Sequence, residues 1–280
     1  MRHYERMLGA AIFTLGIPDG NMEAIRSIQA ETAKMSSATD ALVVSDLSKF
    51  ADADRTDFQE KVNFKRFRGV QVSQSFDSFP QIASSVDWSW MFPDTIQDQF
   101  KYECNASWPI VTSDVLSALN FSRLPAEYLT KCWEMSCADT NVHDALEVLK
   151  LLGSCDLEDY KANGCGCTPR KIVRRFQAVP PAALEQAVLR QPVLAAVRLS
   201  DELQFYQKGV ITPKCTRTPN HEVVVVGLGT SLDGVKYWKM RNTWGPDWGE
   251  DGYFRMSRER GCEAEREALQ VQVLESRQTR

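Results

Sequence analysis

The sequence predicts an α+β protein in which helix-forming and strand-forming segments occupy different parts of the chain. Residues 220–229 and 237–245 are apolar runs bounded by glycine, which is typical of neighbouring buried strands. Residues 1 to about 70 alternate helical and polar patches and contain no cysteine. A further segment has apolar residues at helical spacing, namely Ile110, Val111, Val115, Leu116 and Leu119.

Length and charge limit the classes of protein and partner. A chain of 280 residues forms one large or two modest domains with ample material for a core. The net charge of −4 gives no reason to expect nucleic acid or an anionic membrane as a partner. The longest apolar run near the N-terminus, residues 7–17, is interrupted by Thr14 and two glycines, so we expect no membrane span. We also expect this run to belong to a folded helix rather than to a targeting signal.

The eight cysteines all lie after residue 100, which suggests disulfides formed in an oxidising compartment. The expected location is then secretory or endolysosomal, although no convincing signal peptide is present. The alternative is a reduced intracellular protein with buried thiols. Cys165-Gly166-Cys167 lacks the spacing of a zinc knuckle and no histidine pair accompanies it. We therefore expect no metal site and no cofactor.

One histidine has a chemical context. His221 begins the first strand-like run and Asn242 ends the second, so antiparallel pairing would bring imidazole and amide together. An amide oxygen that accepts the imidazole N–H fixes the tautomer and directs the other ring nitrogen at a nucleophile. Trp244 is placed to cover this contact from water. The pattern indicates part of a catalytic site.

The block Asn242-Thr243-Trp244-Gly245, followed by Trp248-Gly249-Glu250-Asp251-Gly252-Tyr253, resembles the Asn segment of papain-like cysteine peptidases, the cathepsin family. The resemblance implies a helical left lobe, a right lobe built on a mostly antiparallel sheet, and a cleft between them. It begins at Ser85-Val86-Asp87-Trp88 and assigns residues 85–280 to the peptidase domain.

The N-terminal part resembles the inhibitory propeptide of the same family. Residues 44–52 and 56–58 resemble its short strand and the helix after it, whereas residues 5–29 match its helical signature poorly. We therefore expect a propeptide-like domain over residues 1–69 that lies in the cleft, and a linker over residues 70–84. The alternative is a generic helical extension.

Family members place the nucleophile in Cys-x-x-Cys-Trp, and the corresponding stretch is Cys104-Asn105-Ala106-Ser107-Trp108. Ser107 therefore stands at the nucleophile position, with Trp108 after it as a shielding residue. The pKa of a thiol beside a histidine at a helix N-terminus can fall far enough for the thiolate to form. The pKa of a serine hydroxyl cannot be lowered far enough for that. Serine hydrolases orient their histidine with a carboxylate, and Asn242 carries no charge. Proteolysis by Ser107 is expected to be feeble.

Two further departures concern the oxyanion hole and the cleft. The family has an oxyanion-hole glutamine three residues before the structural cysteine, where this chain has Lys101, with Gln99 two residues earlier. Either residue is a candidate for the position: Gln99 if the loop bulges, or Lys101 through its positive charge. Neither is the preorganised neutral donor that the family uses. Losing one such donor typically costs a factor of about 10²–10³ in rate. A glycine pair that approaches the substrate is replaced within residues 138–141, Ala-Asp-Thr-Asn.

The resemblance also implies disulfides. It pairs Cys104 with Cys137, Cys132 with Cys165 or Cys167, and Cys215 with Cys262. Cys155 and the remaining member of the 165/167 pair are extra and could bridge each other.

The departures together lead us to expect a catalytically inactive homologue, a pseudoprotease, with a binding, regulatory or assembly role and an unknown protein partner. The alternatives are a weak hydrolase that uses Ser107, His221 and Asn242, an inhibitor-like binder of other peptidases, and an engineered Cys→Ser zymogen of an active peptidase.

The chain carries two N-glycosylation sequons, Asn105-Ala106-Ser107 and Asn120-Phe121-Ser122. Such tripeptides are common by chance. In a secretory protein, a glycan on Asn105 would stand at the mouth of the expected site.

Overall fold

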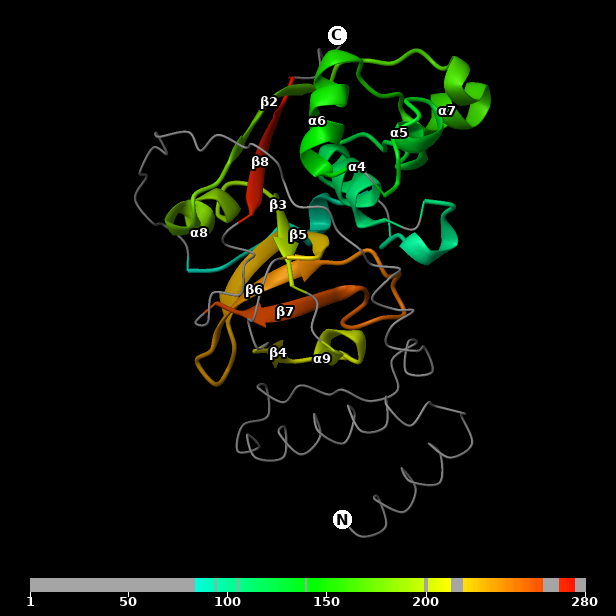
Figure 1. The fold of residues 1–280 in the computed structure, drawn as a ribbon. Helices are drawn as coiled ribbons and strands as arrows, with labels where there is room; N and C mark the ends of the chain where they lie inside the picture. The colour runs from blue at the N-terminus through cyan, green and yellow to red at the C-terminus, as the bar shows by residue number, and fades with distance from the viewer. Residues whose placement is uncertain are drawn as a thin grey trace, which may run out of the picture.

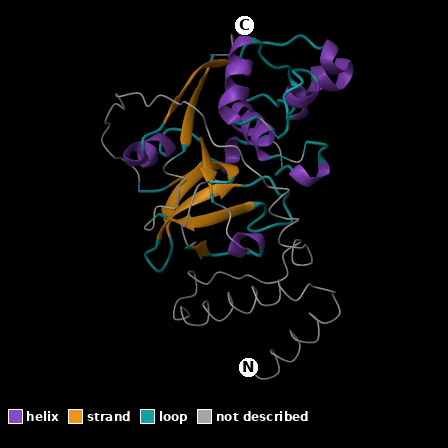
Figure 2. Ribbon diagram, in the orientation of Figure 1, coloured by secondary structure: helices purple, strands orange, loops and turns teal. Residues whose placement is uncertain are grey.

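The computed structural model describes residues 84–93, 95–104, 106–138, 140–198, 201–212, 219–258 and 267–274. The propeptide-like domain expected over residues 1–69, and all of the expected linker except residue 84, lie outside this part of the chain. The described residues form a group of helices and a sheet that lie side by side, as the resemblance implies (Figures 1 and 2).

The sheet has eight strands within the described residues, in the order β2-β8-β3-β5-β6-β7-β4, with β1 paired to β5. All pairs are antiparallel except β4 with β7. The strands are β1 Val86–Asp87, β2 Val173–Ala178, β3 Val193–Val197, β4 Val210–Ile211, β5 His221–Thr230, β6 Lys236–Arg241, β7 Tyr253–Ser257 and β8 Ala268–Val273.

Helices α4, α5, α6 and α7 gather on one side of the molecule, beyond β3 and β5 (Figure 1). The α-helices are α4 Ser107–Asn120, α5 Glu127–Lys131, α6 Val142–Leu151, α7 Leu157–Asn163, α8 Leu184–Val188 and α9 Asp201–Gln204. The described residues also form four short 3-10 helices, η1 Ser89–Met91, η2 Gln99–Lys101, η3 Gly164–Gly166 and η4 Pro181–Ala183. No helix in the described ranges is long and apolar enough to cross a bilayer.

Strand β5 is shared by two hydrophobic cores. Val223 and Val225 belong to a core with Trp244 and Trp248 on one face of the sheet. Val224 and Val226 belong to the other core, which includes residues of α4 and α6. Because successive side chains of a strand point to opposite faces, every second residue of β5 serves one lobe. This alternation explains why the run is apolar throughout rather than amphipathic.

A buried ion pair joins the helical lobe to the sheet. Arg241 at the end of β6 donates from Nε to the Asp114 carboxylate of α4 at 2.7 Å, and both side chains are almost fully buried. The guanidinium also donates to the Tyr253 hydroxyl and to the Thr95 carbonyl, each at 3.2 Å. Planar arginine satisfies several acceptors at once, which favours it in such sites. The pair fixes α4 relative to the end of β6.

Three disulfides tie the helical lobe together. The structure joins Cys104 to Cys137, Cys132 to Cys165, and Cys155 to Cys167. The Cys104–Cys137 disulfide is the one that the resemblance implies. The sequence left open whether Cys132 pairs with Cys165 or Cys167, and the structure pairs it with Cys165, which leaves Cys167 for Cys155. The fourth implied pair, Cys215 with Cys262, lies outside the described residues.

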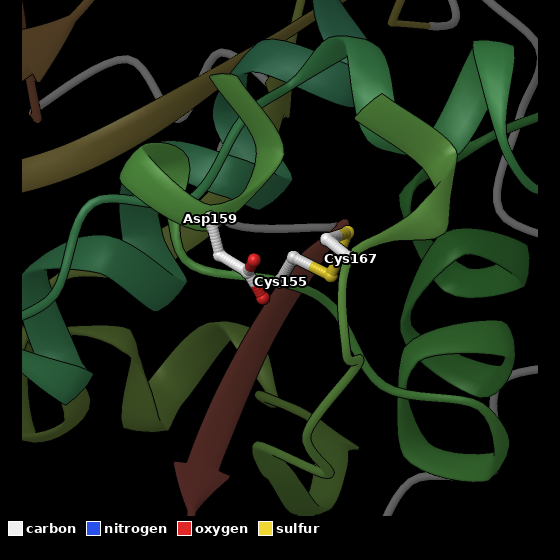
Figure 3. Close-up of side chains that lie close together, drawn as sticks. All are labelled: Cys155, Asp159 and Cys167. Carbon is white, nitrogen blue, oxygen red and sulfur yellow. A yellow bond between two sulfur atoms is a disulfide. The ribbon is translucent and has the colours of Figure 1, made fainter. Parts of the chain in front are cut away.

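Figure 3 shows the Asp159 carboxylate beside the Cys155–Cys167 disulfide. Their ligand atoms lie within 4.8 Å of one another, but both sulfurs are used in the disulfide. Asp159 instead accepts hydrogen bonds from the Thr168 backbone N–H at 3.0 Å and the Asn163 amide at 2.7 Å. The carboxylate therefore fixes the loop that carries Cys167.

We expect the Cys155→Ser, Cys167→Ser variant to lose about 2–3 kcal/mol of unfolding free energy. The disulfide closes a short loop, with a sequence separation of 12, and restricts the unfolded chain accordingly. Urea denaturation of this variant and of the parent, without reductant, measures the difference. A loss below about 0.5 kcal/mol would contradict a stabilising role, since a disulfide typically contributes about 2–4 kcal/mol.

Candidate active site

His221 and Asn242 meet as the sequence predicts. His221 is the first residue of β5, and Asn242 follows the last residue of β6, the strand paired to it. The imidazole Nε2 lies 2.7 Å from the Asn242 side-chain oxygen, and both side chains are fully buried. That oxygen also accepts the Thr243 backbone N–H at 2.8 Å. Because Oδ1 is an acceptor, Nε2 carries the proton and Nδ1 is the acceptor nitrogen.

Trp244 covers the imidazole. Its ring centroid lies 5.2 Å from that of His221, and it packs edge-on against Trp248 at 4.8 Å. Burial lowers the pKa of His221 from 6.5 to about 4, against the opposing effect of the Asn242 hydrogen bond. The imidazole is therefore neutral at physiological pH.

Ser107 is the first residue of α4, and its hydroxyl does not pair with the imidazole. It donates to the Glu222 carboxyl oxygen Oε2 at 2.7 Å and accepts the Glu222 backbone N–H at 3.3 Å. His221 Nδ1, the nitrogen that a nucleophile would use, has no hydrogen-bond partner among the described residues. The structure therefore brings Ser107 and His221 into one region without forming the nucleophile–base contact.

Glu222 is the site residue that the sequence reasoning missed. It follows His221 in β5, so its side chain points to the opposite face, toward α4 and α6. Its carboxyl also accepts a hydrogen bond from the Val142 backbone N–H, at the start of α6. Its one sequence signal is a charge at the head of a strand run that is otherwise apolar.

The surroundings of Glu222 affect its charge in both directions. Burial raises the pKa of Glu222 to about 8, and the nearby Glu267 carboxylate adds to this. The Ser107 and Val142 hydrogen bonds oppose the rise. Those two donors belong to the first turns of two helices, where the macrodipole also favours an anion. At neutral pH the carboxyl is largely protonated and Ser107 remains hydrogen-bonded to it.

Gln99, not Lys101, stands beside the site. Of the two residues that the sequence offers for the oxyanion-hole position, the structure buries the glutamine and leaves the lysine exposed. Gln99 is fully buried, and its side-chain oxygen accepts the Thr243 hydroxyl at 2.5 Å. Its backbone N–H donates to the Thr243 carbonyl at 2.8 Å, next to Asn242. The Lys101 side chain is 77% exposed, with Nζ 3.9 Å from Asp98. The short helix η2 (Gln99–Lys101) accommodates the extra residues before Cys104.

The replaced glycine segment has a structural role at its end. Asn141 caps α6, with its side-chain oxygen accepting the Asp144 backbone N–H at 3.1 Å. The cap thereby fixes the turn that presents Val142 to Glu222. Ala138 is exposed, and Asp139 lies outside the described residues.

Trp108 shields the helical lobe rather than the histidine. It is 2% exposed, packs in the core of α4 and α6, and donates to the Cys137 carbonyl at 3.2 Å. The covering of the imidazole belongs to Trp244.

Comparison with known proteins identifies the family. Residues 82–272 match the family described as papain family cysteine protease. Vignain from Phaseolus vulgaris is 33% identical over 244 residues, covering 76% of this chain and 67% of the relative. Vignain from Vigna mungo is 32% identical with the same coverage.

Solved structures share the fold. Procathepsin L 3 from the larval midgut of Tenebrio molitor is 24% identical, covers 90% of this chain and 88% of its own, and has a TM-score of 0.75. The ragweed pollen cysteine protease Amb a 11 in its proform is 23% identical, with coverage of 92% and 88% and the same TM-score. With an antiparallel His–Asn strand pair, a helix that begins at position 107 and these relatives, the chain belongs to the papain family of cysteine proteases.

Proposed function

We propose that this chain is a papain-family homologue without cysteine-peptidase activity, whose retained fold binds another protein. The observation that carries the proposal is the buried hydrogen bond between the Ser107 hydroxyl and the Glu222 carboxyl at 2.7 Å. The hydroxyl at the nucleophile position is thereby directed toward the Glu222 carboxyl and not toward His221 Nδ1. A catalytic pair of this type requires the nucleophile within hydrogen-bond reach of the imidazole.

The chemistry of the site supports the same conclusion. A serine must lose its proton to histidine in the transition state, so an imidazolium has to form. Burial lowers the pKa of His221 to about 4, which disfavours that cation. Asn242, which orients the ring, is neutral and cannot stabilise it. Burial of the imidazole and the lack of a charged partner for it therefore both oppose proton transfer from Ser107 to His221.

The proposal extends to the N-terminal region and to the cellular location of the protein. We propose that residues 1–69 act as a propeptide-like segment in the cleft, and that the protein passes through a secretory or endolysosomal route. The pro-form relatives with the same fold support the first part. The three disulfides of the helical lobe support the second.

A second candidate function is a weak Ser107-dependent hydrolase with His221 as base and Asn242 as orienting residue. The observation that favours it is the intact His221–Asn242 contact at 2.7 Å together with the buried Gln99, a neutral amide next to it. Movement of the Ser107 hydroxyl from Glu222 to Nδ1 would complete the set.

A fluorophosphonate probe distinguishes the two candidates. The intact chain is expected to remain unlabelled, as judged by intact-mass spectrometry, because Ser107 lacks its base. Ser107→Ala provides the background, and His221→Ala separates base-assisted labelling from non-specific labelling. Labelling at Ser107 that disappears in His221→Ala would overturn the first candidate and establish the second.

A further inference from the structure

We propose that Asn120 is an N-glycosylation site, and that the sugar is attached before the helical lobe closes around Ser122. The acceptor tripeptide is Asn120-Phe121-Ser122, with the amide two residues before the hydroxyl that the transferase requires. The inference rests on the proposed secretory route but not on the absence of peptidase activity.

The end of α4 allows a glycan to project into solvent. Residues 107–118 of the helix are buried, whereas Asn120 is partly exposed and Phe121 is 71% exposed. Phe121 has φ 51°, the left-handed conformation that ends the helix. Asn120 is therefore the point at which α4 emerges from the core.

The location also keeps the glycan away from the candidate active site. Helix α4 has 14 residues and begins at Ser107. At 1.5 Å per residue its two ends are about 20 Å apart. A sugar on Asn120 would lie at the opposite end of the helix from Ser107, so the fold and the site are both compatible with it.

The folded structure opposes the transfer itself. The Ser122 hydroxyl donates a hydrogen bond to the Asp156 carboxylate, and the Leu157 backbone N–H donates to the Arg123 carbonyl at 2.7 Å. Asp156 directly follows Cys155, which is bonded to Cys167. In the folded lobe, where this disulfide is formed, the sequon hydroxyl is engaged and the segment is held. Modification must therefore precede closure of the Cys155–Cys167 bond.

The reaction needs a lipid diphosphate-linked oligosaccharide as the co-reactant. The Asn120 Nδ2 atom forms a bond to the anomeric carbon of the first sugar, and the bond from that carbon to the diphosphate oxygen breaks. The lipid diphosphate departs with the bonding electrons, and the proton lost by the amide passes to a base of the transferase. No electron is gained or lost by the protein.

Translation of the full chain behind a heterologous signal peptide, in the presence of rough microsomes, tests the proposal. The microsomes supply the compartment, so failure does not depend on the native route or on peptidase activity. We expect a gel shift that peptide-N-glycosidase removes, absent in Asn120→Gln and Ser122→Ala and kept in Ser122→Thr. Asn105→Gln provides the control for the other sequon.

The timing has its own measurement. Cys155→Ser, Cys167→Ser is expected to raise the occupied fraction of Asn120 at least about twofold, because the acceptor segment stays open for longer. No shift in microsomes, or a shift unchanged in Asn120→Gln, would overturn the site. Equal occupancy with and without the disulfide would overturn the order of events.

Discussion

Ser107→Cys alone is expected to turn over a peptide substrate far below the rate typical of the family, whereas Ser107→Cys, Glu222→Ala is expected to be roughly 10²-fold faster or more than the single variant. Formation of a nucleophile–base pair contributes typically about 10²–10⁴ in rate. In the single variant the new thiol occupies the place of a hydroxyl that bonds Glu222 at 2.7 Å. The carboxyl keeps it from His221 Nδ1. Removing the carboxyl removes the competing partner.

The reason is mainly geometric, and a third variant tests this. Ser107→Cys, Glu222→Gln keeps a side-chain acceptor of the same size but cannot become charged. It is expected to remain as slow as Ser107→Cys, because the amide oxygen still accepts from position 107. Had charge been the obstacle, this variant would be as fast as the alanine one.

Fluorogenic dipeptide and tripeptide substrates of papain-like peptidases measure the rates. Ser107→Ala, Glu222→Ala is the matched control, since it carries the same cavity without a thiol. Family-typical turnover by Ser107→Cys alone would show that Glu222 does not hold the nucleophile, and would also disprove the proposed loss of function through this contact.

Glu222→Gln is expected to stabilise the protein increasingly as pH rises. Burial raises the pKa of Glu222 from 4.5 to about 8, so the folded carboxyl binds its proton more tightly than the unfolded one. The stability from this proton is fully present below pH 4.5 and is lost as pH rises from 4.5 to about 8. At about 1.4 kcal/mol per pKa unit the loss has an upper bound of roughly 5 kcal/mol.

Glutamine keeps the hydrogen bonds and has no charge to bury. Urea denaturation of parent and variant from pH 5 to pH 8.5, with disulfides intact, is expected to show curves that diverge toward high pH. His221 acts in the opposite sense, since its pKa is lowered to about 4 and its contribution is lost below pH 6.5. It is present in both proteins, so it cancels in the difference.

The matched control for this measurement is Glu127→Gln, at a partly exposed glutamate of α5 that lies 3.6 Å from Lys131. Its stability difference from the parent is expected to stay nearly constant with pH, since surface pairs contribute about 0–1 kcal/mol. A Glu222→Gln curve parallel to that of the parent would mean that the carboxyl remains ionised in the folded protein.

The sequence was sufficient for the strand pair and for the helix at position 107. Glycine-bounded apolar runs predict β5 and β6, and their antiparallel pairing places His221 against Asn242. Apolar residues at helical spacing predict α4, which is buried on nearly all sides. These features depend on local periodicity, which a sequence shows directly.

The position of Gln99 and the role of Glu222 could not be predicted from the sequence. They depend on the length of a loop and on the direction of side chains in space. Counting residues from Cys104 selects Lys101, because a count cannot include the extra turn of η2 (Gln99–Lys101), which leaves Gln99 beside Thr243. The sequence places Glu222 in a strand next to His221 and indicates nothing more. Its role depends on where α4 and α6 begin in space, and no spacing along the chain reveals that.

The alternation of β5 has a consequence for judging activity from sequence. His221 and Glu222 are adjacent residues, yet their side chains lie on opposite faces of the sheet. His221 contacts Asn242 after β6, and Glu222 contacts Ser107 of α4. Under the proposed function, a single substitution at position 222 draws the side chain at position 107 away from the imidazole, while His221, Asn242 and Trp244 keep their contacts. By the same argument, a relative that keeps all the catalytic residues of the family can be inactive. The residue after the catalytic histidine is therefore worth inspecting in such sequences.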